Sequence, residues 1–96
     1  MSIIYYPEHN AIHNELVNNG WTIDNSNSNN KKKFIYTRSN VNPYDEFIIN
    51  YISANEVAVT VPIPCSSISY RNTFLQRDTQ IIQDYLKMHL SNYTCQ

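Results

Sequence analysis

Glycine is almost absent from this chain of 96 residues, which contains only Gly20. Loops that bind phosphate need several glycines, because their backbone amides must approach the phosphate closely. The sequence therefore argues against nucleotide-dependent catalysis and dinucleotide binding, and no cofactor is expected. It also disfavours the many enzymes whose active loops depend on glycine.

Charge and long apolar runs are also scarce. Charged residues make up 16% of the chain and the net charge is −1 at pH 7, whereas proteins that coat nucleic acids usually carry a clear basic excess. No stretch approaches the roughly 18 apolar residues that a membrane span needs, and the first residues lack the basic and apolar regions of a secretory signal. We therefore expect a soluble, intracellular protein without a membrane partner.

Few residues are available for metal binding or thiol chemistry. Cys65 and Cys95 form neither a CxxC pair nor a disulfide framework, so two free thiols are expected. His9 and His13 have the spacing at which two imidazoles can reach one metal, but no third ligand of evident spacing accompanies them. We expect no metal site, and the sequence identifies no catalytic residue.

Asparagine and tyrosine are abundant instead, with 14 and 8 copies. Like isoleucine and lysine, both are encoded by AT-rich codons, so the bias indicates an AT-rich genome more than a chemical need. A large DNA virus, one of its parasites, a phage or an AT-rich microbe would all fit such a genome. We favour a virus or another mobile element, and a viral protein would lie in the host cytoplasm or the virion.

The N-terminal part of the chain has the pattern of a helix. Apolar residues recur at helical spacing over about 7–19, and the single glycine follows directly. We expect Gly20 to adopt the left-handed conformation of a C-terminal cap, with Trp21 folding back onto Leu16 or Val17.

The rest of the chain predicts strands followed by a second helix. Alternating and β-branched segments predict four or five strands, over about 21–23, 33–37, 46–53, 56–64 and 66–71. Thr73 to Gln76 match a capping box, and the apolar residues that follow predict a helix ending near residue 91. We expect a mobile polar loop over about 24–31 and a short flexible tail over about 92–96.

This order predicts a single α+β domain spanning residues 1–96. It comprises an N-terminal helix, a four- or five-stranded antiparallel meander sheet and a C-terminal helix, with both helices on one face of the sheet. Alternation assigns the covered face to aromatic and branched residues: Phe34, Tyr36, Phe47, Ile49, Tyr51, Val57, Val59, Val61, Ile68 and Tyr70.

The opposite face of the sheet is too apolar for a solvated surface and too polar for a core. Its residues are Ile35, Thr37, Ile48, Asn50, Ile52, Ala58, Thr60, Ser67, Ser69 and Arg71. This composition is typical of a contact surface. We therefore predict a small non-enzymatic protein-interaction module that pairs with itself as a homodimer or binds another protein. The expected contact residues are Ile48, Ile52 and Arg71 on the sheet and Tyr85 on the last helix.

A basic cluster supports one alternative. Lys31, Lys32, Lys33 and Arg38 could bind nucleic acid weakly through phosphate contacts. The competing interpretation is that the lysines protect the start of an aggregation-prone strand, because Phe34 beside them is assigned to the core.

A small enzyme is the second alternative. It would need a pocket in which His89, Cys65 or Asp45 converge, and spacing along the chain does not reveal such convergence.

Overall fold

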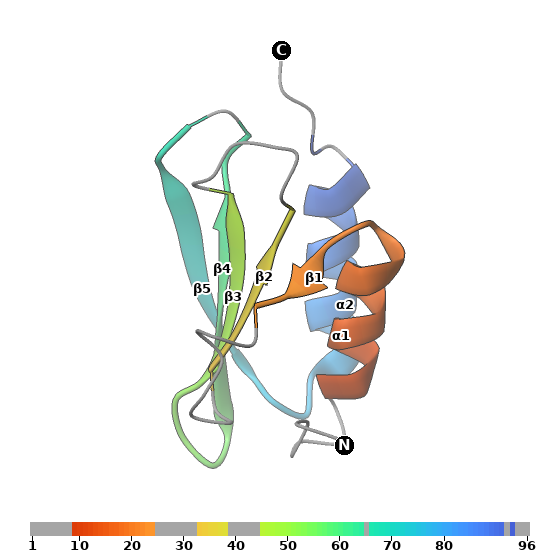
Figure 1. The fold of residues 1–96 in the computed structure, drawn as a ribbon. Helices are drawn as coiled ribbons and strands as arrows, with labels where there is room; N and C mark the ends of the chain where they lie inside the picture. The colour runs from red at the N-terminus through yellow and green to blue at the C-terminus, as the bar shows by residue number, and fades with distance from the viewer. Residues whose placement is uncertain (1–8, 25–32, 39–44, 65, 92, 94–96) are drawn as a thin grey trace.

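The computed structural model describes residues 9–24, 33–38, 45–64, 66–91 and 93. Its elements are α1 (His9–Asn18), β1 (Thr22–Ile23), β2 (Lys33–Thr37), β3 (Glu46–Tyr51), β4 (Glu56–Pro62), β5 (Ser69–Leu75) and α2 (Thr79–Ser91). The strands form one antiparallel sheet in the order β1-β2-β3-β4-β5, and both helices lie on one side of it (Figure 1). The predicted α+β fold with a five-stranded meander is confirmed.

The predicted loop and tail fall mostly outside the described residues. Residues 25–31 of the loop are not described, and of the tail only Tyr93 is. Asp24, which follows β1, is still bonded to β2, because its N–H donates to the carbonyl of Ile35 (2.7 Å).

Helix α1 ends in the cap that the single glycine predicts. Gly20 has φ of 91°. Its N–H donates to the carbonyl of Val17 (3.0 Å), and the N–H of Trp21 donates to the carbonyl of Leu16 (3.1 Å). These two bonds define a Schellman motif. Leu16 and Trp21 are both fully buried, whereas Val17 is 42% exposed, so the chain folds back onto Leu16.

Replacing Gly20 tests this cap. A Cβ built at Gly20 would meet only the Cδ of Arg38, at an ordinary 3.7 Å, so the cost of a side chain comes from the positive φ. We expect Gly20→Ala to lower the free energy of unfolding by about 1 kcal/mol. Gly20→Asn should cost less, because asparagine tolerates the left-handed region. Urea unfolding of the two variants measures the difference, and equal losses would contradict the backbone explanation.

The core lies between the helices and the sheet. All the residues of β2, β3 and β4 that alternation assigns to the covered face are buried: Phe34, Tyr36, Phe47, Ile49, Tyr51, Val57, Val59 and Val61. The helices contribute Ile12, Leu16, Ile82 and Leu86, and Trp21 and Tyr93 complete the cluster. Alternate residues of a strand point to the same face of a sheet. The alternation in the sequence therefore predicted the buried residues of these three strands correctly.

The predicted start of the last helix is wrong. Strand β5 continues to Leu75, and α2 begins only at Thr79, so Thr73 to Gln76 do not form a capping box. Phe74 pairs with Val57 in the ladder between β4 and β5, and this pairing keeps the segment extended. Asp78 precedes the first helical residue, a position where aspartate is a favoured N-cap.

Two residues predicted for the core are exposed. Tyr70 pairs with Val61 and therefore lies on the helix side of the sheet, but it is 57% exposed. Ile68 precedes β5 and is 62% exposed. Because β5 is the last strand of the sheet, only β4 flanks it, and the helices leave this end of the strand uncovered.

Candidate functional site

The outer face of the sheet carries three of the four predicted contact residues. The strand registers place Ile48, Thr60 and Arg71 in one row across β3, β4 and β5. Ile48 is half-buried, Arg71 is exposed, and Ile52, just after β3, is 44% exposed. The helices lie on the other side of the sheet and do not cover this row (Figure 1).

The outer face is less open than its composition predicts. Ile35 is only 7% exposed and Ala58 only 1%, although both belong to this face. Ala58 is small and lies in register between Asn50 of β3 and Thr73 of β5. The more exposed part of this face therefore lies toward β5.

Strand β5 forms an unprotected edge of the sheet. It has seven residues, and all of them except Phe74 are exposed. Native edges are usually blunted by shortness, charge or proline. The opposite edge strand, β1, has only two residues, whereas β5 has a single charged residue, Arg71, and no proline. The two edges therefore differ in their capacity to pair with another strand.

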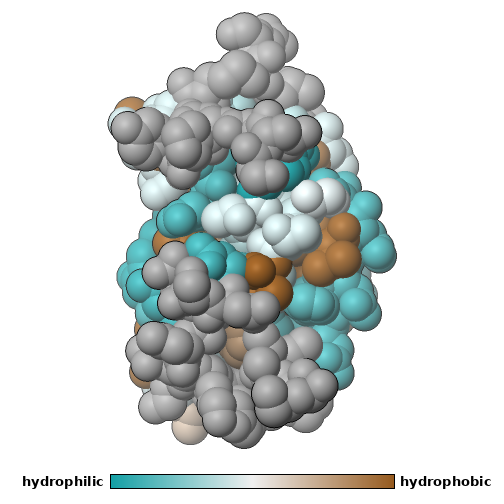
Figure 2. Space-filling view, viewed as in Figure 1, coloured by the Kyte–Doolittle hydropathy of each residue, from teal (hydrophilic) through white to brown (hydrophobic). Residues whose placement is uncertain are grey.

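Several large apolar side chains of β5, its flank and α2 are exposed. Of the seven large apolar residues that are exposed in the described part of the chain, five belong to β5, its N-terminal flank or α2: Ile68, Tyr70, Leu75, Ile81 and Met88. On the side of the molecule seen in Figure 1, apolar residues lie in small separate patches among hydrophilic ones (Figure 2).

The fourth predicted contact residue, Tyr85, lies on the helix side of the same edge. Its hydroxyl accepts a hydrogen bond from Nδ2 of Asn72 (2.9 Å), and its ring lies 5.1 Å from that of Phe74. The Tyr85 ring also packs against the ring of His89, with centroids 4.6 Å apart. Arg71 and Asn72 are neighbours in β5, so this strand joins the outer-face candidates to Tyr85.

The basic cluster is only partly described. Lys31 and Lys32 lie outside the described residues, and Lys33 is exposed at the start of β2. The guanidinium carbon of Arg38 lies 5.2 Å from the ring centroid of Trp21 and 5.6 Å from that of Tyr93. Arg38 is thus engaged in cation–π contacts with two buried rings. Nucleic-acid binding by this cluster stays a prediction.

The two histidines of α1 form a buried hydrogen-bond network that the sequence did not reveal. His9 is completely buried, and its Nδ1 lies 2.8 Å from the hydroxyl of Tyr51. Its Nε2 lies 2.8 Å from the hydroxyl of Tyr36, which also lies 2.8 Å from Nδ1 of His13. The His9 ring stacks on Phe34 with centroids 4.0 Å apart.

This network is satisfied with both imidazoles neutral. Each neutral imidazole donates one proton and accepts another, and each hydroxyl can do both. Burial lowers the pKa of His9 to about 3, with a further contribution from His13, and burial also lowers the pKa of His13. The network therefore fixes α1 to β2 and β3 as a set of neutral groups. Among the described residues, no three His, Cys, Asp or Glu side chains come close enough to hold a metal.

A second buried polar group lies at the start of β3. Asp45 is 1% exposed, and neither carboxylate oxygen forms a hydrogen bond with a described residue. Burial, and then the nearby Asp45, raise the pKa of Tyr93, although its hydroxyl lacks hydrogen-bond geometry with any described residue.

Cys65 lies outside the described residues, and His89 packs against Tyr85. No described hydrogen bond joins Asp45 to His89.

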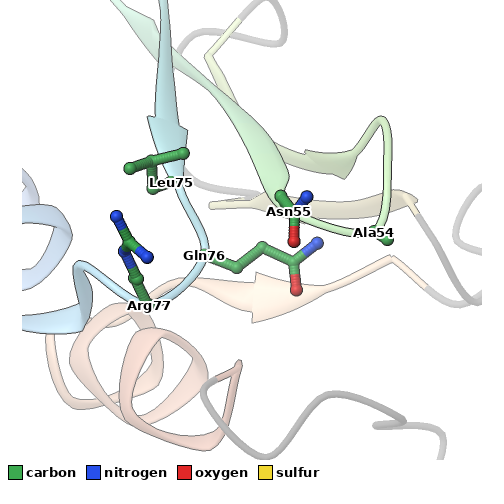
Figure 3. A pocket seen from close by; sticks show the side chains of 5 residues that line it. All are labelled: Ala54, Asn55, Leu75, Gln76 and Arg77. Atoms are coloured by element: carbon green, nitrogen blue, oxygen red, sulfur yellow. The ribbon is translucent and has the colours of Figure 1, made fainter.

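A cleft of about 440 Å³ lies between the turn after β3 and the end of β5. Its lining residues are Ala54, Asn55, Leu75, Gln76 and Arg77, and the Gln76 side chain extends toward the turn (Figure 3). Nε2 of Gln76 donates to the carbonyl of Ser53 (2.7 Å). The backbone N–H of Gln76 donates to the backbone carbonyl of Asn55 (2.8 Å). The lining offers one guanidinium but no nucleophile and no acid–base pair.

No protein-family model matches the chain, and no curated protein or solved structure is significantly similar to it. None of the helices in the described ranges is long and apolar enough to cross a membrane. The function must therefore be inferred from the chain's own surface.

Proposed function

We propose that this protein is a non-enzymatic protein-interaction module that works as a homodimer. The observation that carries the proposal is the unprotected seven-residue edge strand β5, which itself carries the exposed apolar side chains of Tyr70 and Leu75. Unpaired strand edges bind other strands readily. Arg71 and Tyr85 lie at this edge, Ile52 lies further along the outer face, and the half-buried Ile48 contributes less.

The buried polar groups support binding over catalysis. The imidazoles of His9 and His13 are hydrogen-bonded to tyrosine hydroxyls. The guanidinium of Arg38 makes cation–π contacts with two rings of the core. A general base must reach the proton of a bound substrate. His9 is completely buried, so it serves the attachment of α1 to the sheet. The asparagine and tyrosine content further favours a virus or mobile element with an AT-rich genome as the source.

Light scattering after size exclusion tests the proposal. The chain has a mass of 11.3 kDa, so a homodimer should give twice that value, 22.6 kDa. We expect this mass at micromolar concentration, with dissociation on dilution. A constant mass of 11.3 kDa up to millimolar concentration would overturn the homodimer.

A charge near β5 should weaken the dimer. Tyr70 is 57% exposed beside the edge, and Tyr70→Glu would place a carboxylate against the partner's apolar side chains. We expect the dissociation constant to rise by about 10-fold or more. Val17→Glu is the matched control, because Val17 is 42% exposed but belongs to α1. Equal effects of the two changes on the measured mass would contradict an interface at β5.

A further inference from the structure

We infer that β5 pairs antiparallel with the β5 of a second copy across a two-fold axis at Asn72, so that two five-stranded sheets become one continuous sheet. This inference rests on the proposed homodimer and names its surface and register. Addition of a strand to an exposed edge supplies main-chain hydrogen bonds, and a two-fold interface uses the same patch on both copies.

The hydrogen-bond phase of the ladder shows which backbone groups of β5 point outward. The carbonyl of Ile68 accepts from the N–H of Ile63, and the N–H of Gln76 donates to the carbonyl of Asn55. Antiparallel ladders alternate between bonded and non-bonded pairs, so the even-numbered residues of β5 bond to β4. Pro62, which has no N–H, faces the odd-numbered Ser69, in agreement with this phase.

The odd-numbered residues of β5 therefore direct their N–H and C=O groups away from β4. The carbonyl of Leu75 accepts from the N–H of Asp78 (3.0 Å). No hydrogen bond within the described ranges takes up the outward groups of Arg71 and Thr73. The outward N–H and C=O groups of these two residues can therefore form main-chain hydrogen bonds with a second strand.

A two-fold axis at Asn72 makes those sites self-complementary. Arg71 of one copy then lies opposite Thr73 of the other, and each pair exchanges two main-chain hydrogen bonds. This register overlaps all seven residues of β5. A shift of the axis to Arg71 would place two guanidinium groups opposite each other, which is unfavourable. A shift to Thr73 would shorten the overlap.

The side chains fit the same register. Tyr70 lies opposite Phe74 of the second copy on the helix side of the sheet, in a non-bonded pair where side chains approach most closely. The two Asn72 amides face each other at the axis. Nδ2 of Asn72 donates one proton to Tyr85 in its own chain, so its second proton and its Oδ1 can bond the other amide. Ile81 and Met88 of α2, both more than half exposed, flank Tyr85 at helical spacing.

Disulfide trapping tests the register directly. In a chain that carries Cys65→Ser and Cys95→Ser, we expect Asn72→Cys to form a cross-linked dimer under mild oxidation, because the two copies of position 72 face each other across the axis. Leu75→Cys is the matched control. Position 75 lies opposite position 69 of the second copy, so its two copies are six residues apart along the strands and should not cross-link.

Proline substitutions supply a test that needs no cysteine. Thr73→Pro removes an N–H that points outward, so the monomer should stay folded while the dissociation constant rises by at least about 100-fold. Asn72→Pro removes an N–H that bonds β4, and it should reduce folding itself, which circular dichroism measures. A Thr73→Pro protein that remains as dimeric as the wild type overturns the β5 pairing.

The outcomes separate this inference from the proposed homodimer. A dimer by light scattering that cross-links through Leu75→Cys, or through neither position, overturns the Asn72 register and leaves the homodimer standing. A wild-type monomer at every concentration overturns both. A dimer that cross-links only through Asn72→Cys and dissociates with Thr73→Pro establishes the continuous sheet.

Discussion

Acidification from pH 7 to pH 4 is expected to lower the free energy of unfolding by about 3 kcal/mol through His9 alone. Burial lowers the pKa of His9 from 6.5 to about 3 in the folded protein. Below pH 6.5, His9 therefore becomes protonated in the unfolded chain while it stays neutral in the folded protein. The stability contributed by neutral His9 is complete above pH 6.5 and is lost progressively as the pH falls toward 3.

The surroundings of His9 explain why its protonation is so unfavourable. The imidazole is fully buried and stacks on Phe34, and its two nitrogens are hydrogen-bonded to the hydroxyls of Tyr36 and Tyr51. A positive charge on the nearby His13 opposes a second positive charge on His9 and also lowers its pKa. A hydroxyl can accept a proton in a hydrogen bond but cannot neutralise an imidazolium, so the charge would stay uncompensated.

Urea unfolding at several pH values measures this effect. His9→Gln removes the titrating group, so we expect a less stable protein whose stability changes less between pH 7 and pH 4. His13→Gln is the matched control. His13 is only half-buried, so this variant should keep most of the wild-type slope. The carboxylates are common to all three proteins and cancel in the comparison. An unchanged slope in His9→Gln would refute the assignment.

The sequence predicted those parts of the fold that are decided by residues close together along the chain. The valines of β4 alternate strictly, and all three are buried. The single glycine follows a helical segment, and Gly20 caps α1 with a positive φ. In both cases the residues that decide the structure are neighbours along the chain.

The sequence was misleading where a distant strand decides the structure. Thr73 to Gln76 satisfy the local rule for a helix start, yet the pairing of Phe74 with Val57 keeps the segment extended. The motif Thr-x-x-Gln carries no information about a partner strand. The β-forming residues Tyr70 and Phe74 and the N-capping residue Asp78 were the available signals for the longer strand.

The hydrogen-bond network of His9 and the edge strand β5 could not be predicted from the sequence for a similar reason. The hydrogen bonds of His9 join residues 27 and 42 positions apart along the chain. The spacing of His9 and His13 fits a metal pair and a tyrosine network equally well, and only the sheet register brings Tyr36 between them. Likewise, the outward direction of Arg71 and Thr73 follows from the phase of the β4–β5 ladder, which no composition reveals.

Trp21→Ala is expected to be the most damaging single truncation, with a loss of about 3–5 kcal/mol. Trp21 is fully buried, meets Phe47 edge-on at 4.7 Å and Tyr93 at 5.2 Å, and lies under the guanidinium of Arg38. Its removal leaves a cavity beside three side chains that pack on it. For a domain of this size, total stability is about 5–15 kcal/mol, so the melting temperature should fall by more than about 10 °C.

Circular dichroism is the suitable measurement for this variant, because Trp21 is the only tryptophan and its fluorescence disappears with it. Val17→Ala is the control on the same turn, and it should cost well under 1 kcal/mol because Val17 is 42% exposed. Trp21→Phe should recover part of the loss, since a smaller ring still fills most of the site against Phe47. Similar melting temperatures for Trp21→Ala and Val17→Ala would show that the aromatic cluster does not hold α1 to the sheet.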